Sequence, residues 1–240
     1  MTIAERWAEV NARVAAACER AGRLASEVTI IAVSKTHPVS AIREALAAGA
    51  TDFGENYAQE LAAKQAELAA TDAGSATLTH TALTHTALRW HYIGRLQRNK
   101  ARLVAGRVAL VHAVDSVELA EELARRAGAA GQPILLAVNL AGEATKGGVT
   151  AATAPDLARA LAGVPGVSLD GLMTMPPPAD DAAASRPYFA GLRALRDRLA
   201  DELGRPLPVL SMGMSDDFEV AIACGATHVR IGTAIFGARG

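Results

Sequence analysis

The feature that most constrains the fold is a repeated alternation of short apolar runs with segments of helical periodicity. Eight apolar runs follow one another, at residues 28–33, 51–54, 90–93, 108–114, 133–140, 167–173, 207–210 and 227–231. Each run except the last precedes a helix-like segment, and the links are short, so the strands must lie parallel. Eight such repeats in 240 residues predict an α/β protein that forms a single (β/α)8 barrel of the TIM type.

Two segments fall outside this repeat. Residues 3–21 carry apolar side chains at helical spacing, so we expect an extra N-terminal helix that takes the place of the helix missing after the last strand. Residues 71–88 contain a near-duplicated Leu-Thr-His-Thr-Ala pattern with His80 and His85. This pattern favours a surface loop over a metal site. We therefore expect one domain over residues 1–240, with the extra helix within 1–25 and a loop insertion at 71–88.

Charge and cysteine content limit the possible functions. The formal net charge is −1, which gives no indication of nucleic acid or an anionic membrane as a partner. Cys18 and Cys224 are isolated and match no metal or redox spacing, so no metal is expected. Residues 1–10 carry charges that do not suit a signal peptide, and no apolar run reaches membrane-spanning length. We expect a cytoplasmic protein.

Lys35 is the candidate nucleophile. It ends the apolar run, and Pro38 then opens the next helical segment. A lysine at a strand end is more often a surface residue, but this chain uses arginine for most of its positive charge. Burial at this place would favour the neutral amine, which can form a Schiff base with a carbonyl compound and which arginine cannot supply.

The carboxyl ends of the strands converge on one mouth of such a barrel. The residues expected there are Lys35, Asn56, His91, Asp115, Asn139, Met173, Ser211 and Arg230. The last two loops, at residues 211–215 and 232–233, are rich in glycine and serine. They either make tight turns only or form a phosphate site, which barrels commonly build from these two loops.

Arg230 lies on an otherwise apolar strand and alternation turns it away from Val229 and Ile231. A barrel-interior arginine needs a partner, either a carboxylate such as Asp115 or a ring nitrogen of a bound heteroaromatic group. A Schiff-base lysine, a phosphate site and an arginine near the ring together suggest pyridoxal 5′-phosphate. Facing a permanent cation, the pyridine nitrogen would stay unprotonated and the cofactor would be a weak electron sink.

Five motifs resemble the pyridoxal phosphate homeostasis proteins, also called the YggS-like or proline synthase co-transcribed family. They are Ala32–Thr36, Phe53–Tyr57, His91–Lys100, Ser211–Asp217 and Arg230–Gly237. The family resembles the barrel domain of alanine racemase and lacks its second domain. The chain departs from the family pattern in its long 71–88 insertion and in Asn139–Gly142, where a serine-containing loop is commoner.

The resemblance implies that the cofactor is held as a Schiff base on Lys35, with Arg230 facing the pyridine nitrogen and Asn56 beside the ring. It implies a phosphate site made of Ser211, Gly213, Ser215, Gly232 and Thr233. It further implies a role in intracellular vitamin B6 homeostasis without an established reaction, in a monomer whose candidate partners are pyridoxal-phosphate-dependent apo-enzymes.

Two alternatives remain open at this point. One is a racemase or lyase that uses the same cofactor, with Tyr57 or His91 as the second acid/base group. The other is a cofactor-free barrel of the class I aldolase type, in which Lys35 would bind a sugar phosphate directly.

Overall fold

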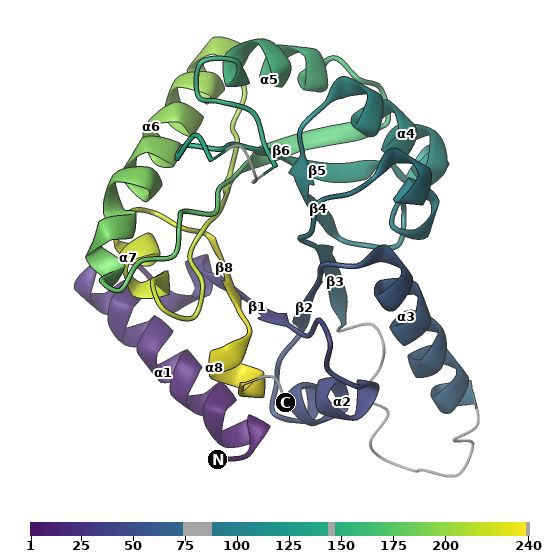
Figure 1. Cartoon of the computed structure of the whole chain (residues 1–240), viewed down its shortest axis with the longest axis vertical. Coiled ribbons are helices and arrows are strands. Elements are labelled where there is room, and N and C mark those ends of the chain that lie inside the picture. Colours follow the sequence, from purple (N-terminus) through teal and green to yellow (C-terminus); the bar gives the residue numbers. More distant parts are fainter. Residues whose placement is uncertain (74–87, 144–146, 239–240) are drawn as a thin grey trace.

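A computed structural model of the chain describes residues 1–73, 88–143 and 147–238. Within these ranges, eight parallel strands close into a barrel in chain order, and helices surround it (Figure 1). The strands are β1 (Thr29–Val33), β2 (Asp52–Glu55), β3 (Arg89–Tyr92), β4 (Leu110–Val114), β5 (Gln132–Ala137), β6 (Val167–Met173), β7 (Val209–Ser211) and β8 (His228–Ile231). The ring closes where β8 pairs with β1, with Ile31 opposite Arg230. The predicted α/β barrel is confirmed.

Helices cover the outer face of the barrel. They are α1 (Ile3–Arg20), α2 (Val39–Ala47), α3 (Ala58–Ala73), α4 (Val117–Ala127), α5 (Ala154–Ala162), α6 (Arg186–Leu203), α7 (Phe218–Ala223) and α8 (Thr233–Phe236). Strand β4 is buried at every residue, which explains why its sequence is apolar except at His112 rather than alternating. None of the described helices combines the length and the apolar character that a membrane crossing requires.

The N-terminal helix packs where the sequence predicted it. Thr2 caps α1, and its side chain and that of Glu5 form reciprocal bonds with the backbone. The helix lies against α7 and α8, on the closing side of the barrel (Figure 1). Arg13 fixes this contact, because its guanidinium lies 4.6 Å from the ring centre of Phe218 and 2.7 Å from Glu219.

Three sequence expectations about elements need correction. A short helix, α8, does follow the last strand, so α1 supports it rather than replacing it. The helix-like segment expected between the third and fourth strands is the 3-10 helix η3 (Arg98–Leu103) and not an α-helix. Helix α3 continues through Ala73, and Leu88 packs against the core, so the insertion is shorter than predicted at both ends. His80 and His85 lie outside the described residues.

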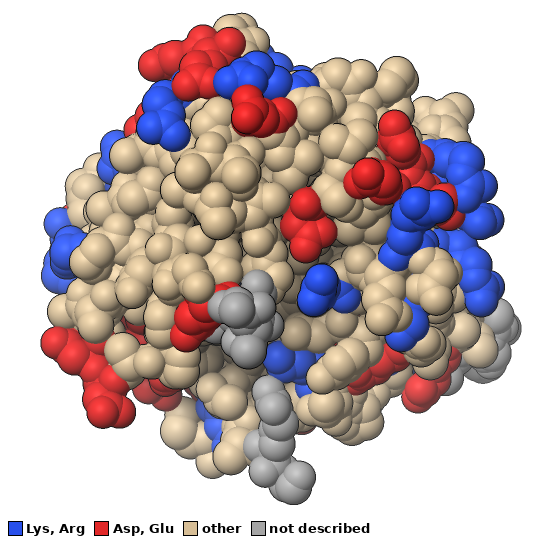
Figure 2. Space-filling model, turned by 45° about the horizontal axis from the view of Figure 1, so that its top comes forward, with Lys and Arg blue, Asp and Glu red and all other residues tan. Residues whose placement is uncertain are grey.

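Acidic and basic side chains intermix on the face shown in Figure 2, and no patch of one sign covers it. This distribution agrees with the formal net charge of −1.

Candidate cofactor-binding site

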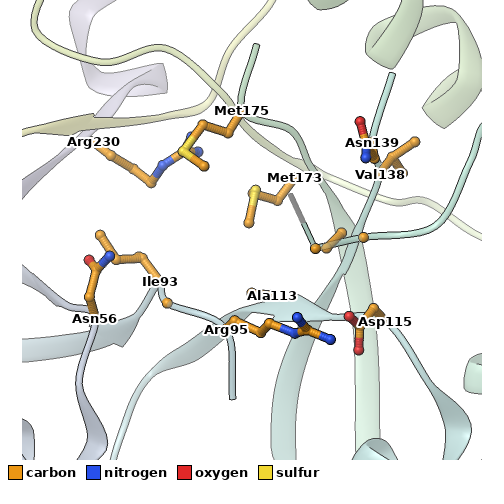
Figure 3. A pocket seen from close by; sticks show the side chains of 14 residues that line it. Asn56, Ile93, Arg95, Ala113, Asp115, Val138, Asn139, Met173, Met175 and Arg230 are labelled. Atoms are coloured by element: carbon orange, nitrogen blue, oxygen red, sulfur yellow. The ribbon is translucent and has the colours of Figure 1, made fainter. Parts of the chain in front are cut away.

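A cavity of about 710 Å³, counting the space open to solvent, lies at the carboxyl ends of the strands. Of the residues predicted at this mouth, Asn56, Asp115, Asn139, Met173 and Arg230 line it (Figure 3). Lys35 and the residues of the two glycine- and serine-containing loops do not line this cavity. Asn56 and Arg230 lie on one side of it and Asn139 on the opposite side (Figure 3).

His91 is not at the mouth. It is the third residue of β3, its side chain is only 4% exposed, and its Nε2 lies 2.8 Å from Asp52, the first residue of β2. His91 lies within the strand and not after it, because β3 ends at Tyr92. The polar residue that follows β3 and lines the cavity is Arg95. Arg95 is a mouth residue that the sequence reasoning missed.

Lys35 lies in the turn directly after β1 and is half-buried. The next residue, Thr36, has φ +66° and is the one non-glycine residue with positive φ in the described ranges. Its N–H donates to the Glu60 carboxylate at 2.5 Å, which helps to hold this costly conformation. The conformation of Thr36 and its bond to Glu60 therefore fix the turn that carries Lys35.

The loop after β8 lies beside the end of β1. A Cβ at Gly232 would lie 3.5 Å from the Val33 carbonyl oxygen. The predicted phosphate loop thus lies beside the end of the strand that precedes the predicted lysine, at the seam that closes the barrel.

Lys64 is a second buried lysine that the sequence reasoning passed over. Its Nζ donates at 2.7 Å to the Ser34 carbonyl, to Glu55 and to Glu60. Three acceptors occupy all three hydrogens of an ammonium group, so Lys64 is a structural cation and not a nucleophile. The i,i+4 spacing of Glu60 and Lys64 was the signal that could have identified this pair.

Arg230 is 6% exposed and donates to Ser211 Oγ at 2.7 Å and to the Thr174 carbonyl at 2.9 Å. Its predicted partner Asp115 is not within ion-pair distance in the described structure. Burial lowers the pKa of Arg230 to about 10, so the guanidinium remains charged at neutral pH. Two of its five N–H groups are used, which leaves donors for a ligand in the cavity that it lines.

The two predicted phosphate loops carry unused backbone donors. Among the described residues, the N–H groups of Ser215, Asp216 and Thr233 have no acceptor, whereas Ala234 N–H donates to Ser215 Oγ at 3.4 Å. Gly213 has a different purpose. Its φ is +93°, and a Cβ there would lie 2.6 Å from that of Ala221, so glycine is needed for packing against α7.

Asn56 is fixed at the cavity edge. Tyr92 Oη donates to its carbonyl oxygen at 2.9 Å, and a Cβ at Gly94 would lie 2.2 Å from that same oxygen. Its side-chain Oδ1 is buried and has no partner within the described structure. A buried acceptor without a partner is costly, and a bound ligand would satisfy it.

These features fit pyridoxal 5′-phosphate, which supplies an aldehyde for an amine, a ring nitrogen for a donor and a phosphate for free N–H groups. Lys35 would provide the amine, Arg230 the donor to the ring nitrogen, and the loops at Ser215 and Thr233 the phosphate contacts. No group of three or more His, Cys, Asp or Glu residues is arranged to hold a metal ion in the described ranges.

Comparison with known proteins agrees with this description. The family model of the alanine racemase N-terminal domain matches residues 11–240. Alanine racemase from Corynebacterium glutamicum superposes with a TM-score of 0.66 at 19% identity, over 98% of this chain and 62% of that one, and so shows the fold alone. Fold and site together define an alanine-racemase-type barrel.

More similar proteins define the family. PipY of Synechococcus elongatus PCC7942, in a structure with PLP bound, superposes with a TM-score of 0.81 at 38% identity, over 98% of this chain and 100% of that one. The pyridoxal phosphate homeostasis protein of Pseudomonas aeruginosa is 47% identical, over 99% of this chain and 96% of its own. That of Aquifex aeolicus is 43% identical, over 100% and 99%. This chain belongs to the pyridoxal phosphate homeostasis protein family.

Proposed function

We propose that this protein binds pyridoxal 5′-phosphate as a Schiff base on Lys35 and takes part in intracellular homeostasis of the cofactor. The observation that carries the proposal is the full-length similarity to PipY, whose structure is described with PLP bound. Lys35 is half-buried and follows Val33, the residue that the Gly232 loop adjoins, and this supports the proposal because the amine and the phosphate donors would lie on one side of the barrel.

The site residues of the proposal are Lys35, Asn56, Ser211, Gly213, Ser215, Arg230, Gly232 and Thr233. Ser211 and Gly213 would act indirectly. The Ser211 hydroxyl accepts from the Arg230 guanidinium, and the Gly213 carbonyl accepts from the Arg230 backbone N–H at 3.0 Å. Both residues thereby position the arginine rather than the phosphate.

The same proposal includes four further statements: the protein delivers cofactor to apo-enzymes, is monomeric, is cytoplasmic and does not turn over a substrate.

Catalysis as a racemase or lyase would need a second acid/base group at the ring. Of the two residues considered for it, His91 is inside the barrel and Tyr57 is 56% exposed in a neighbouring cavity. Amino-acid-dependent α-proton exchange in deuterated water, lost in Lys35→Ala, would establish catalysis.

The test of the proposal is the visible absorption of protein mixed with pyridoxal 5′-phosphate. We expect wild-type protein to show the band of a protein-bound Schiff base and Lys35→Ala to lose it. Lys100→Ala is the matched control, because Lys100 lines the neighbouring cavity and should leave the band unchanged. A band that persists in Lys35→Ala would contradict the proposal. Colourless wild-type protein that borohydride traps on a sugar phosphate would instead favour the aldolase alternative.

A further inference from the structure

A chain of buried polar side chains crosses the interior of the barrel. Arg230 Nη1 lies 2.7 Å from Ser211 Oγ, which lies 2.8 Å from His112 Nδ1. His112 Nε2 lies 3.0 Å from His91 Nδ1, and His91 Nε2 lies 2.8 Å from Asp52 Oδ1. All five residues are at most 6% exposed. This series of hydrogen-bonded side chains runs from the cavity, which Arg230 lines, to the opposite end of the barrel, where β2 begins with Asp52.

The mouth end of the chain dictates the direction of its first hydrogen bonds. Arginine can only donate, so Ser211 Oγ accepts from Arg230. The serine hydroxyl then gives its own hydrogen to His112 Nδ1, the other polar atom beside it. A neutral His112 therefore carries its hydrogen on Nε2 and donates to His91 Nδ1.

The far end demands the same direction independently. Asp52 is an ionised carboxylate that also accepts from Arg89 at 2.8 Å and from Thr51 at 2.8 Å. Hydrogen bonds from His91, Arg89 and Thr51 outweigh the effect of burial and lower the pKa of Asp52 to about 2. A carboxylate can only accept, so His91 must donate from Nε2. With both rings neutral, each hydrogen bond points from Arg230 towards Asp52.

The opposite direction would require a charged ring inside the barrel. If His112 donated to Ser211, His91 would have to donate from both of its nitrogens and become a cation. His112 itself is kept neutral, because His91, His228 and Arg230 surround it and His228 lies 6.2 Å away between ring centres. Burial and these neighbours lower the pKa of His112 well below its ordinary value. The opposite direction would therefore place the charge on His91, which the measurement of the tautomers distinguishes.

We propose that Ser211, His112 and His91 are positioning residues that hold the Arg230 guanidinium through a one-way hydrogen-bond chain anchored on Asp52. The inference rests on the proposed function, because the group that Arg230 would meet is the pyridine nitrogen of the cofactor. Because Ser211 holds the guanidinium on the side away from the cavity, Arg230 directs its remaining N–H groups into the cavity in one orientation. The ring nitrogen then stays an acceptor, so residues that do not touch the cofactor influence its electronic character through Arg230.

The tautomers can be measured without cofactor. Long-range proton–nitrogen NMR of the apo protein at neutral pH should show His112 and His91 as neutral rings with hydrogen on Nε2 and a bare Nδ1. The variants His112→Gln and His91→Gln assign the signals. A hydrogen on Nδ1 of either ring, as the other tautomer or as a cation, would overturn the proposal regardless of whether pyridoxal phosphate binds.

The effect on the cofactor is tested with a pair of variants. His112→Gln keeps one acceptor and one donor and should retain the wild-type visible band and its pH profile. His112→Phe removes both groups and should shift the band and change its pH profile, while borohydride still traps the cofactor on Lys35. An unchanged band and pH profile in His112→Phe would overturn the positioning role. Failure of wild-type protein to trap the cofactor would instead contradict the proposed function and leave the NMR result standing.

Discussion

Lys35 and Lys64 adjoin the same peptide, yet their surroundings give them opposite chemistry. Lys64 donates to the carbonyl oxygen of Ser34, the residue before Lys35, and is neutralised by Glu55 and Glu60. Lys35 is half-buried on a turn that Glu60 also holds through Thr36. The buried cation thus stabilises the turn that carries the proposed nucleophile.

Removal of the Lys64 charge should destabilise the protein strongly. In Lys64→Met the Glu55 carboxylate, which is 0% exposed, would remain buried without its cation. Such a loss costs about 3–5 kcal/mol in the free energy of unfolding. Urea unfolding of Lys64→Met, Lys64→Met/Glu55→Gln and the control Lys100→Met measures this. The double variant should recover part of the loss, and equal stability of Lys64→Met and wild type would contradict the assignment.

His228 should make stability depend on pH. Burial, with repulsion from His91, lowers its pKa from 6.5 to about 4 in the folded protein. Between these values the unfolded chain binds a proton that the folded chain does not, so stability is complete above pH 6.5 and falls as pH approaches 4. The difference is on the order of 3 kcal/mol. Unfolding at neutral pH and at about pH 4.5 should show a smaller pH effect in His228→Gln, and an equal effect would contradict this prediction.

At the residue scale the sequence predicted the position of Arg230 better than its contacts. Arg230 was correctly expected inside the barrel because strand alternation is local information. Its partner was not predictable, since Ser211 and Thr174 reach it through pairing of β6, β7 and β8. His112 stood as a polar residue in an apolar run, and only the closed barrel shows that it meets His91.

Among the elements, β6 and β7 make the closest approach to a glycine. A Cβ at Gly171 would lie 1.9 Å from the Val209 carbonyl oxygen. This oxygen belongs to the backbone, so no side-chain rotation can relieve the clash. By contrast, a Cβ at Gly191 in α6 would lie 3.8 Å from Leu140 Cδ1, an ordinary contact. Glycine is therefore required sterically at Gly171 in the sheet, whereas at Gly191 a substitution changes only the helix propensity.

We expect Gly171→Ala to lower the free energy of unfolding by about 3 kcal/mol through overpacking. Gly191→Ala, its matched control, should raise it by about 0.5–1 kcal/mol, because alanine is the better helix former. Thermal and urea unfolding of the two variants measures both changes. Equal effects of the two substitutions would show that the β6–β7 spacing is not as tight as described.

Element types were predictable where periodicity was long, as in α1, and less so where an element was short. The segment of η3 has helix-forming residues, but its six residues form a 3-10 helix between β3 and β4. Helix α8 has four residues and no periodic signal, and α1 supports it by packing. Tertiary contact rather than propensity decides such short elements.

At the scale of the whole molecule, the alternation of strands and helices was sufficient to predict a closed barrel. Closure places the end of β1, which precedes Lys35, beside the loop after β8, although almost the entire chain separates them. The sequence predicted only that both follow the carboxyl ends of their strands. It could not predict the different settings of the two proposed site residues. Lys35 is half-buried in a turn outside the strands, whereas Arg230 is held by Ser211 inside the barrel.

The most direct test of the central claim is borohydride reduction of the protein loaded with pyridoxal 5′-phosphate, followed by intact mass measurement and peptide mapping. The account predicts one added phosphopyridoxyl group, located on Lys35. Modification located on Lys64 or Lys100 with Lys35 unmodified, or no modification at saturating cofactor, would contradict it.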